Sequence, residues 1–122
     1  KETDNNLINN TPFFIWKDGM KKKTINKVTS QLNILPTVLN LFGISYNQND
    51  YIQTDALDSD YEPMVFFSDY SWYDGNVYVY QGEVSNGKSI SNEELENKNH
   101  FITRITKKND LTLKFDYFKK NK

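Results

Sequence analysis

The chain has 122 residues, a length that suits one compact domain, and 37% of them are hydrophobic and 15% aromatic. The aromatic content excludes a disordered chain, and the lack of Cys excludes a disulfide scaffold, a thiolate metal site and a cysteine nucleophile. The net charge of −1 argues against a nucleic-acid partner, and no run approaches the roughly 18 apolar residues of a membrane-spanning helix. The composition therefore predicts a soluble domain of mixed α and β structure.

The amino-terminal third predicts one buried strand. Residues 1–10 are polar and predict an irregular lead-in. Residues 13–16 (Phe-Phe-Ile-Trp) form an apolar run opened by Pro12, a pattern typical of a strand that is buried on both faces. The three lysines at 21–23 predict a solvated loop after this strand.

Residues 34–42 predict a helix that is buried on most sides, because only two of them are polar. Asn33 can cap the amino-terminal end, and Pro36 lies in the first turn, where its missing N–H costs nothing. Gly43 is the residue expected to end the helix.

Residues 46–61 predict a polar, acidic surface loop. Four carboxylates within eleven residues leave calcium binding open as a weaker alternative, but the spacing lacks the central Gly and the final Glu of an EF-hand loop. These carboxylates belong to Asp50, Asp55, Asp58 and Asp60.

An antiparallel meander of short strands is expected next. Residues 64–67 are apolar and follow Pro63, residues 77–80 alternate as a half-covered strand does, and residues 83–85 can return the chain. Asp74-Gly75 is a strong turn signal between the first two of these strands.

The carboxyl-terminal part predicts helices. Ser91 and Glu94 have the spacing of a capping box, which indicates that a helix starts there. Residues 110–118 fit either a short helix capped by Asp110 or a strand, and we favour the helix.

No catalytic constellation can be assembled from these residues. His100 is the only histidine, it has no serine or carboxylate signature beside it, and the chain has no glycine-rich phosphate loop. One segment, residues 68–74, combines aromatic rings with carboxylates and hydroxyls and could line a groove for a sugar, a glycerol or a lipid headgroup. Its candidate residues are Asp69, Ser71, Trp72 and Tyr73. The alternative is that its aromatic rings face a small core.

Two stretches carry a family resemblance. Residues 11–16 (TPFFIW) and 30–44 (SQLNILPTVLNLFGI) resemble the sulfatase family of the alkaline phosphatase superfamily, in which a buried strand precedes a helix that contains Pro-Thr and ends in Gly-Ile. Their order with residues 63–67, 71–78 and 110–120 is most similar to that of the lipoteichoic acid synthase-like phosphoglycerol transferases of Gram-positive bacteria. The resemblance covers residues 11–120.

The resemblance implies an α+β fragment of an α/β domain of the alkaline phosphatase and sulfatase type, with a buried strand, a buried helix, a small antiparallel sheet and C-terminal helices. Residues 1–122 would form a single C-terminal segment of that domain. Residues 11–44 would supply a strand and a helix to the main domain, and residues 63–122 would form the C-terminal antiparallel sheet and helices.

The function implied is that of a membrane-anchored enzyme at the extracellular face of the cell membrane. Such an enzyme moves phosphoglycerol from a lipid-linked donor to a cell-envelope polymer with a Thr nucleophile and Mn or Mg. No residue here matches the nucleophile or metal-ligand motifs, so we assign no catalytic and no metal-binding residue and expect no cofactor and no activity in the isolated chain. Expected partners are the upstream remainder of the domain and, for the fragment, a second copy.

Two alternatives remain open. One is a sulfatase or phosphodiesterase of the same fold, and the other is a non-catalytic extracellular binding module.

Overall fold

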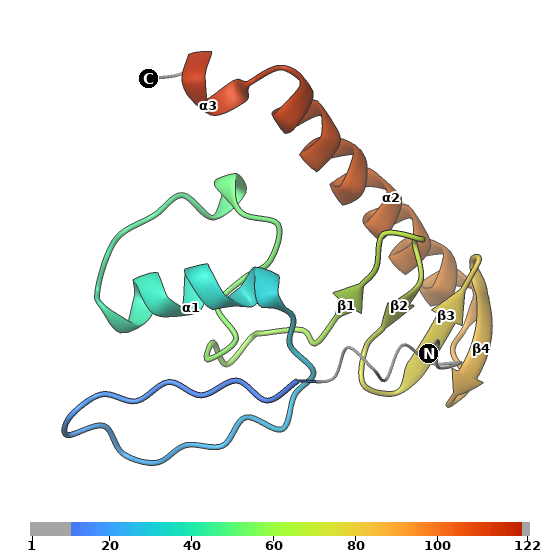
Figure 1. Ribbon diagram of the computed structural model, residues 1–122. Coiled ribbons are helices and arrows are strands. Elements are labelled where there is room, and N and C mark those ends of the chain that lie inside the picture. The colour runs from blue at the N-terminus through green and yellow to red at the C-terminus, as the bar shows by residue number, and fades with distance from the viewer. Residues whose placement is uncertain (1–10, 121–122) are drawn as a thin grey trace.

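The computed structural model describes residues 11–120 and has the α+β architecture that the sequence predicts (Figure 1). Residues 1–10, for which an irregular lead-in is predicted, lie outside the described residues. The helical elements are the 3-10 turns η2 (Gln31–Asn33) and η3 (Gln48–Asp50) and the α-helices α1 (Ile34–Leu41), α2 (Asn92–Lys114) and α3 (Tyr117–Lys120). The strands are β1 (Val65–Phe66), β2 (Trp72–Tyr73), β3 (Val77–Tyr80) and β4 (Glu83–Gly87).

The four strands form one antiparallel sheet in the order β1-β2-β3-β4, so the predicted meander is confirmed. In the middle of the sheet Trp72 of β2 pairs with Val79 of β3. At the start of β3, Val77 pairs with Gly87, and the register between β3 and β4 shifts between Tyr78 and Val79. The turn at Asp74-Gly75 leads into β3 as expected, but it follows β2, a two-residue strand that was not predicted.

The hydrophobic core lies between this sheet and the first half of α2. Its buried members are Trp72, Val77, Val79 and Ile102, and partly buried apolar residues surround them. In Figure 1, α2 begins beside the sheet and then extends well beyond it. A small hydrophobic core therefore packs the sheet against the first half of α2.

Helix α2 begins where the capping signal predicts. Ser91 is its N-cap, and the Ser91 side chain accepts a hydrogen bond from the Glu94 backbone N–H. The expectation that Asp110 caps a separate segment is wrong, because no Gly or Pro interrupts the helix and α2 continues through Asp110. It ends before Asp116, whose φ of 51° breaks the helix, and α3 follows. The helical interpretation of residues 110–118 is thus confirmed over the strand.

Helix α1 confirms the predicted element but not its cap. Gly43, with φ of 66°, ends it, and the Ile44 N–H reaches back to the Leu39 carbonyl at 2.9 Å. Asn33 lies in the preceding turn η2, where Ser30 is the capping residue. The Asn33 side chain accepts a hydrogen bond from the Ser30 N–H at 2.8 Å, so Asn33 is the third helical residue (N3) of a capping box in which Ser30 is the N-cap.

The expected burial of this helix is wrong. Among the residues of α1 only Pro36 and Thr37 are buried, and Phe42 at its end is 69% exposed. The physical reason is that α1 contacts the molecule largely through polar groups, as described below, which leaves Leu35 exposed and the other apolar side chains of the helix, apart from Pro36, only partly buried.

The predicted strand at residues 13–16 is also wrong. The described chain has no strand before β1, and the four side chains of this run are exposed, with Trp16 at 86%. Residues 11–27 run away from the rest of the molecule and return as an open loop (Figure 1). A strand needs a neighbouring strand to pair its backbone N–H and C=O groups, and no described segment lies in that position.

Candidate functional site

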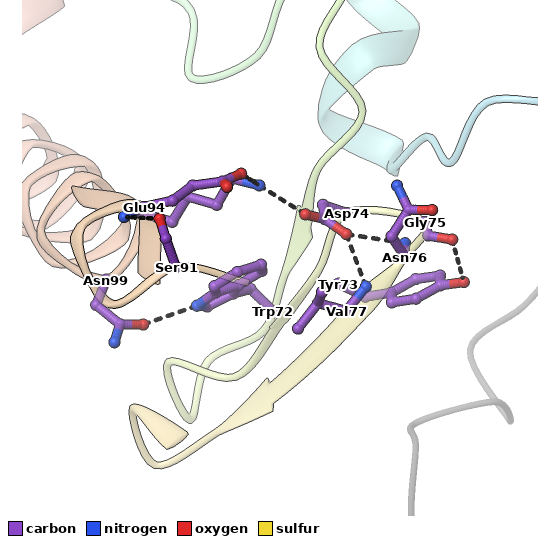
Figure 2. Close-up of polar contacts among 10 residues, drawn as sticks. Trp72, Tyr73, Asp74, Gly75, Asn76, Val77, Ser91, Glu94 and Asn99 are labelled. Carbon is purple, nitrogen blue, oxygen red and sulfur yellow. Dashed lines mark hydrogen bonds and ion pairs between the residues drawn. The ribbon is translucent and has the colours of Figure 1, made fainter. Parts of the chain in front are cut away.

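Trp72, one of the four candidate groove residues, is an anchor between β2 and α2. It has no exposed surface, and its Nε1 donates a hydrogen bond to Asn99 Oδ1 at 2.8 Å (Figure 2). Asn99 in turn donates to the Gly82 carbonyl at 2.9 Å, so one amide ties the helix to both halves of the sheet. With its ring enclosed and its N–H used, Trp72 offers nothing to a ligand in this structure.

Ser71 and Asp69 hold the turn between β1 and β2. Ser71 is fully buried, its Oγ donates to Asp69 Oδ1, and its backbone N–H donates to the same oxygen at 3.0 Å. The hydrogen bond from the Ser71 hydroxyl lowers the pKa of the Asp69 carboxyl. Asp69 is exposed and therefore ionised at neutral pH, with one oxygen engaged in the turn.

Tyr73 lies half-buried at the other end of β2. Its Oη donates to the Gly75 carbonyl at 3.0 Å, which closes the turn into β3 (Figure 2). The structure thus separates the four candidates: Trp72 and Ser71 are buried, and Asp69 and Tyr73 lie at opposite ends of a short strand. This arrangement favours a structural role for the segment, and contact of Asp69 or Tyr73 with a substrate stays a prediction.

A charged cluster that the sequence analysis did not identify lies beside this segment. Asp74 accepts hydrogen bonds from the backbone N–H groups of Asn76 and Val77, each at 2.8 Å, and Lys98 Nζ lies 2.6 Å from its second oxygen. Lys98 also pairs with Glu94 at 2.9 Å. The four-residue spacing of Glu94 and Lys98 in a predicted helix could have indicated their ion pair. No sequence signal indicates that Lys98 also pairs with Asp74, which lies 24 residues earlier.

The environment of Asp74 fixes its charge. Burial raises the pKa of this carboxyl, but the hydrogen bonds from Lys98 and from the two backbone N–H groups outweigh burial and leave the pKa below its ordinary value. For Lys98, burial lowers the pKa and the two carboxylates more than compensate, so its pKa is raised. Both groups are charged at neutral pH and saturated by structural partners, which suits an ion pair that fixes the turn rather than an acid or a base.

The acidic loop does not gather its carboxylates. Asp55 is buried and accepts hydrogen bonds from the Asn40 amide and from the Leu57 N–H at 2.8 Å, whereas Asp58 and Asp60 are exposed. Within residues 11–120 no three His, Asp or Glu side chains are arranged to hold a metal ion. The weaker calcium hypothesis therefore finds no support in the described part of the chain.

Instead, Asp55 belongs to a buried polar network beneath α1. Thr37 Oγ1 donates to the Asn33 carbonyl at 2.7 Å and accepts from the Ala56 N–H at 2.9 Å. Asn33 Nδ2 donates to the Thr54 carbonyl at 2.9 Å, and Tyr61 Oη donates to the Val28 carbonyl at 2.8 Å. These bonds attach α1 to the loop through polar groups, a common solution where backbone must be buried without a sheet.

The opposite side of α1 is an uncovered apolar surface, and it is the strongest candidate for a functional site. Residues 28–49 contain no charged side chain, so this surface lacks the charges that usually cover an exposed helix. We name the exposed apolar residues of this helix region the α1 surface: Leu32, Leu35, Phe42 and Ile44. The run at 13–16 is a second segment with exposed apolar side chains, and exposed apolar groups of this kind are candidates for an interaction site.

No protein-family model, curated protein or solved structure matches this chain. Within residues 11–120, no helix combines the length and the apolar character needed to cross a bilayer. The sole histidine, His100, is exposed on α2.

Proposed function

We propose that this chain is the C-terminal part of a sulfatase-like domain, of the lipoteichoic acid synthase-like phosphoglycerol transferase type, and that it packs on the rest of that domain through residues 13–16 and the α1 surface. One observation carries the proposal. The two segments that the resemblance assigns to the main domain both expose large apolar side chains here, whereas the sheet and the first half of α2 share a core of their own.

The energetics support such packing. Burying one large apolar side chain contributes about 1.5–3 kcal/mol, so covering the α1 surface and residues 13–16 would stabilise the assembly strongly. In a larger sheet, residues 13–16 would gain neighbouring strands for their backbone groups, and α1 would gain a cover for its apolar side. The two sequence expectations that fail for the chain alone, a buried strand and a buried helix, would then hold in the parent.

The proposed activity belongs to the parent, at the extracellular face of the cell membrane. The remainder of the domain would provide the Thr nucleophile and a divalent cation, Mn²⁺ or Mg²⁺, which polarises the phosphate of the lipid-linked donor. The residues described here would complete the fold. Within them the remaining candidates are Asp69, for contact with a glycerol hydroxyl, and Tyr73, for packing against glycerol carbons, since Trp72 and Ser71 are enclosed.

The test uses the chain extended by the residues encoded upstream of Lys1. We expect release of phosphoglycerol from a lipid-linked donor that requires Mn²⁺ and stops with EDTA. Hydrolysis of a sulfate ester or a simple phosphodiester instead would favour the alternative of a sulfatase or phosphodiesterase.

Hydrogen exchange tests the packing separately from the activity. Backbone amides of residues 13–16 and of α1 should exchange at least tenfold more slowly in the extended protein than in the 122-residue chain. The double variant Leu35→Glu/Phe42→Glu should remove this protection, whereas Val84→Glu, at an exposed apolar residue of β4, should not. Equal exchange rates in the two proteins would contradict the proposal.

A further inference from the structure

A third group of exposed apolar side chains lies at the far end of α2 and in α3. Residues 107–120, which we name the basic aromatic segment, extend beyond the sheet and end in a short helix (Figure 1). Their large apolar side chains are exposed, with Leu113 at 72%, and include Leu111, Leu113, Phe115, Tyr117 and Phe118.

This part of the chain is also strongly basic. Residues 103–122 contain seven Lys or Arg and two Asp, a net charge of +5, whereas residues 1–102 contain eight Lys and fourteen Asp or Glu, a net charge of −6. The overall charge of −1 therefore conceals an acidic middle region and two basic stretches, the second being residues 17–27 with five Lys and one Asp.

Cations and rings lie side by side in the segment. Lys114 Nζ is 5.8 Å from the centre of the Phe115 ring, and the rings of Tyr117 and Phe118 meet edge to face at 5.3 Å. The nearest acidic partner, Asp116, is 3.7 Å from Lys119 in an exposed pair, which screens that ammonium group only weakly.

The contrast with the α1 surface points to a different kind of partner. The α1 surface is apolar without charges, as a face that packs on protein is. The basic aromatic segment mixes ammonium groups with aromatic rings and leucines, and this mixture suits the boundary of a bilayer, where rings enter the headgroup layer and lysines meet lipid phosphates.

We infer that the basic aromatic segment binds the surface of a bilayer that contains anionic phospholipids. The ligand is the phosphate-rich headgroup layer, contacted by Lys107, Lys114 and Lys119, with Phe115 and Phe118 inserted between headgroups. This binding is independent of the proposed transferase activity, because it needs neither the α1 surface nor a catalytic centre.

The test is binding of the 122-residue chain to vesicles, followed by co-sedimentation. Vesicles of phosphatidylcholine with about 30% phosphatidylglycerol should bind the chain at least tenfold more strongly than phosphatidylcholine alone. An increase in NaCl from about 0.1 to 0.5 M should release most of it, because the attraction is screened within a Debye length. In the background Trp16→Phe, a Phe118→Trp probe should shift its fluorescence to shorter wavelength on binding, since Trp72 is already enclosed.

Variants locate the binding. Phe115→Ser/Phe118→Ser and Lys114→Glu/Lys119→Glu should each weaken binding at least tenfold, with circular dichroism used to check that α2 remains folded. The control Phe14→Ser/Trp16→Ser removes two aromatic residues that are at least as exposed but lie in the other basic part of the chain, next to Lys17 and the lysines at 21–23. This variant should bind like the unchanged 122-residue chain.

Three results would overturn the inference. Equal binding to neutral and anionic vesicles would remove the charge argument, and loss of binding in the Phe14/Trp16 control alone would assign it to the other segment. A dimer that Phe115→Ser/Phe118→Ser abolishes, found together with no vesicle binding, would show that the segment meets a second copy of the chain.

Discussion

The two halves of this molecule contain nearly the same number of apolar residues, but only the second half builds a hydrophobic core from them. Residues 11–62 contain 21 apolar or aromatic residues, and residues 63–118 contain 22. The second half buries five of them: Trp72, Val77, Tyr78, Val79 and Ile102. Among residues 11–62, Tyr61 is the only one of them that is buried. The difference is therefore one of arrangement and not of composition.

Sequence distance between partners explains the difference. In residues 63–118 each strand pairs with the next one along the chain, and short turns bring them together before α2 covers the sheet. In residues 11–62 the apolar run and α1 have no complementary apolar element within the described chain. The first half is then stabilised by buried polar contacts such as that between Thr37 and Ala56.

The largest effect that distinguishes the halves comes from the two tryptophans. Trp72→Ala should lower the free energy of unfolding by about 3–5 kcal/mol, because it opens a cavity between the sheet and α2 and leaves Asn99 without its donor. Trp16→Ala should change it by less than about 0.5 kcal/mol, since the ring is 86% exposed. Urea titration followed by far-ultraviolet circular dichroism measures both, and equal losses would contradict the division of the molecule.

The next largest effect concerns two glycines. A Cβ at Gly87 would lie 2.1 Å from the Asn76 carbonyl oxygen, and the φ of 113° is unfavourable for other residues, so Gly87→Ala should cost about 2–3 kcal/mol. Gly43, at the end of α1, has a φ of 66° and no atom within 4 Å of such a Cβ, so Gly43→Ala should cost only about 1 kcal/mol. Thermal unfolding of the two variants ranks them, and the reverse order would show that the strand β4 is loosely held.

These contrasts also show which parts of the fold were predictable. The sheet, the cap at Ser91 and the end of α1 at Gly43 follow from signals a few residues long, namely turn dipeptides, capping residues and periodicity. The strand at residues 13–16 was not realised because a strand depends on partners that may lie anywhere in a chain, and its apolar pattern says only that partners are needed.

The candidate site was less predictable. The sequence places rings and carboxylates together in residues 68–74, but whether Trp72 faces a ligand or a core depends on α2, which begins twenty residues later. The ion pair of Asp74 with Lys98 is likewise non-local. The exposed face of α1 could have been suspected from the uncharged stretch 28–49, but the sequence could not show that its buried side would be polar.

A smaller effect is expected for the Asp74–Lys98 pair. The pKa of Asp74 is depressed below its ordinary value of 3.8, so the carboxylate stabilises the fold above about pH 4, and this contribution is lost as pH falls through the lower, folded pKa. Asp74→Asn should therefore cost about 1–2 kcal/mol at pH 7. The difference in unfolding free energy between this variant and the unchanged chain should shrink as pH falls and Asp74 becomes protonated. Unfolding free energies from pH 7 to 2.5 measure the convergence, with Asp110→Asn as the control for loss of one exposed carboxylate. If the unfolding free energies of Asp74→Asn and the unchanged chain keep a constant difference at every pH, the Asp74–Lys98 ion pair is not the cause of the lost stability.

The smallest effect on stability is expected at the α1 surface, and there it should appear in association instead. Phe42→Ser and Leu35→Ser should each change the free energy of unfolding by less than about 0.5 kcal/mol, because both side chains already contact water in the folded chain. The same apolar residues remain available to a second copy, and the unpaired backbone of residues 13–16 adds strand edges that favour pairing between chains. We therefore expect the 122-residue chain to form dimers at high concentration, and the double variant Leu35→Ser/Phe42→Ser to weaken them. Analytical ultracentrifugation at rising concentration measures this, with Val84→Ser, at an exposed apolar residue of β4, as the matched control. A strictly monomeric chain, or equal weakening by Val84→Ser, would mean that the uncovered half does not drive association, and that its apolar face is tolerated in water without a partner.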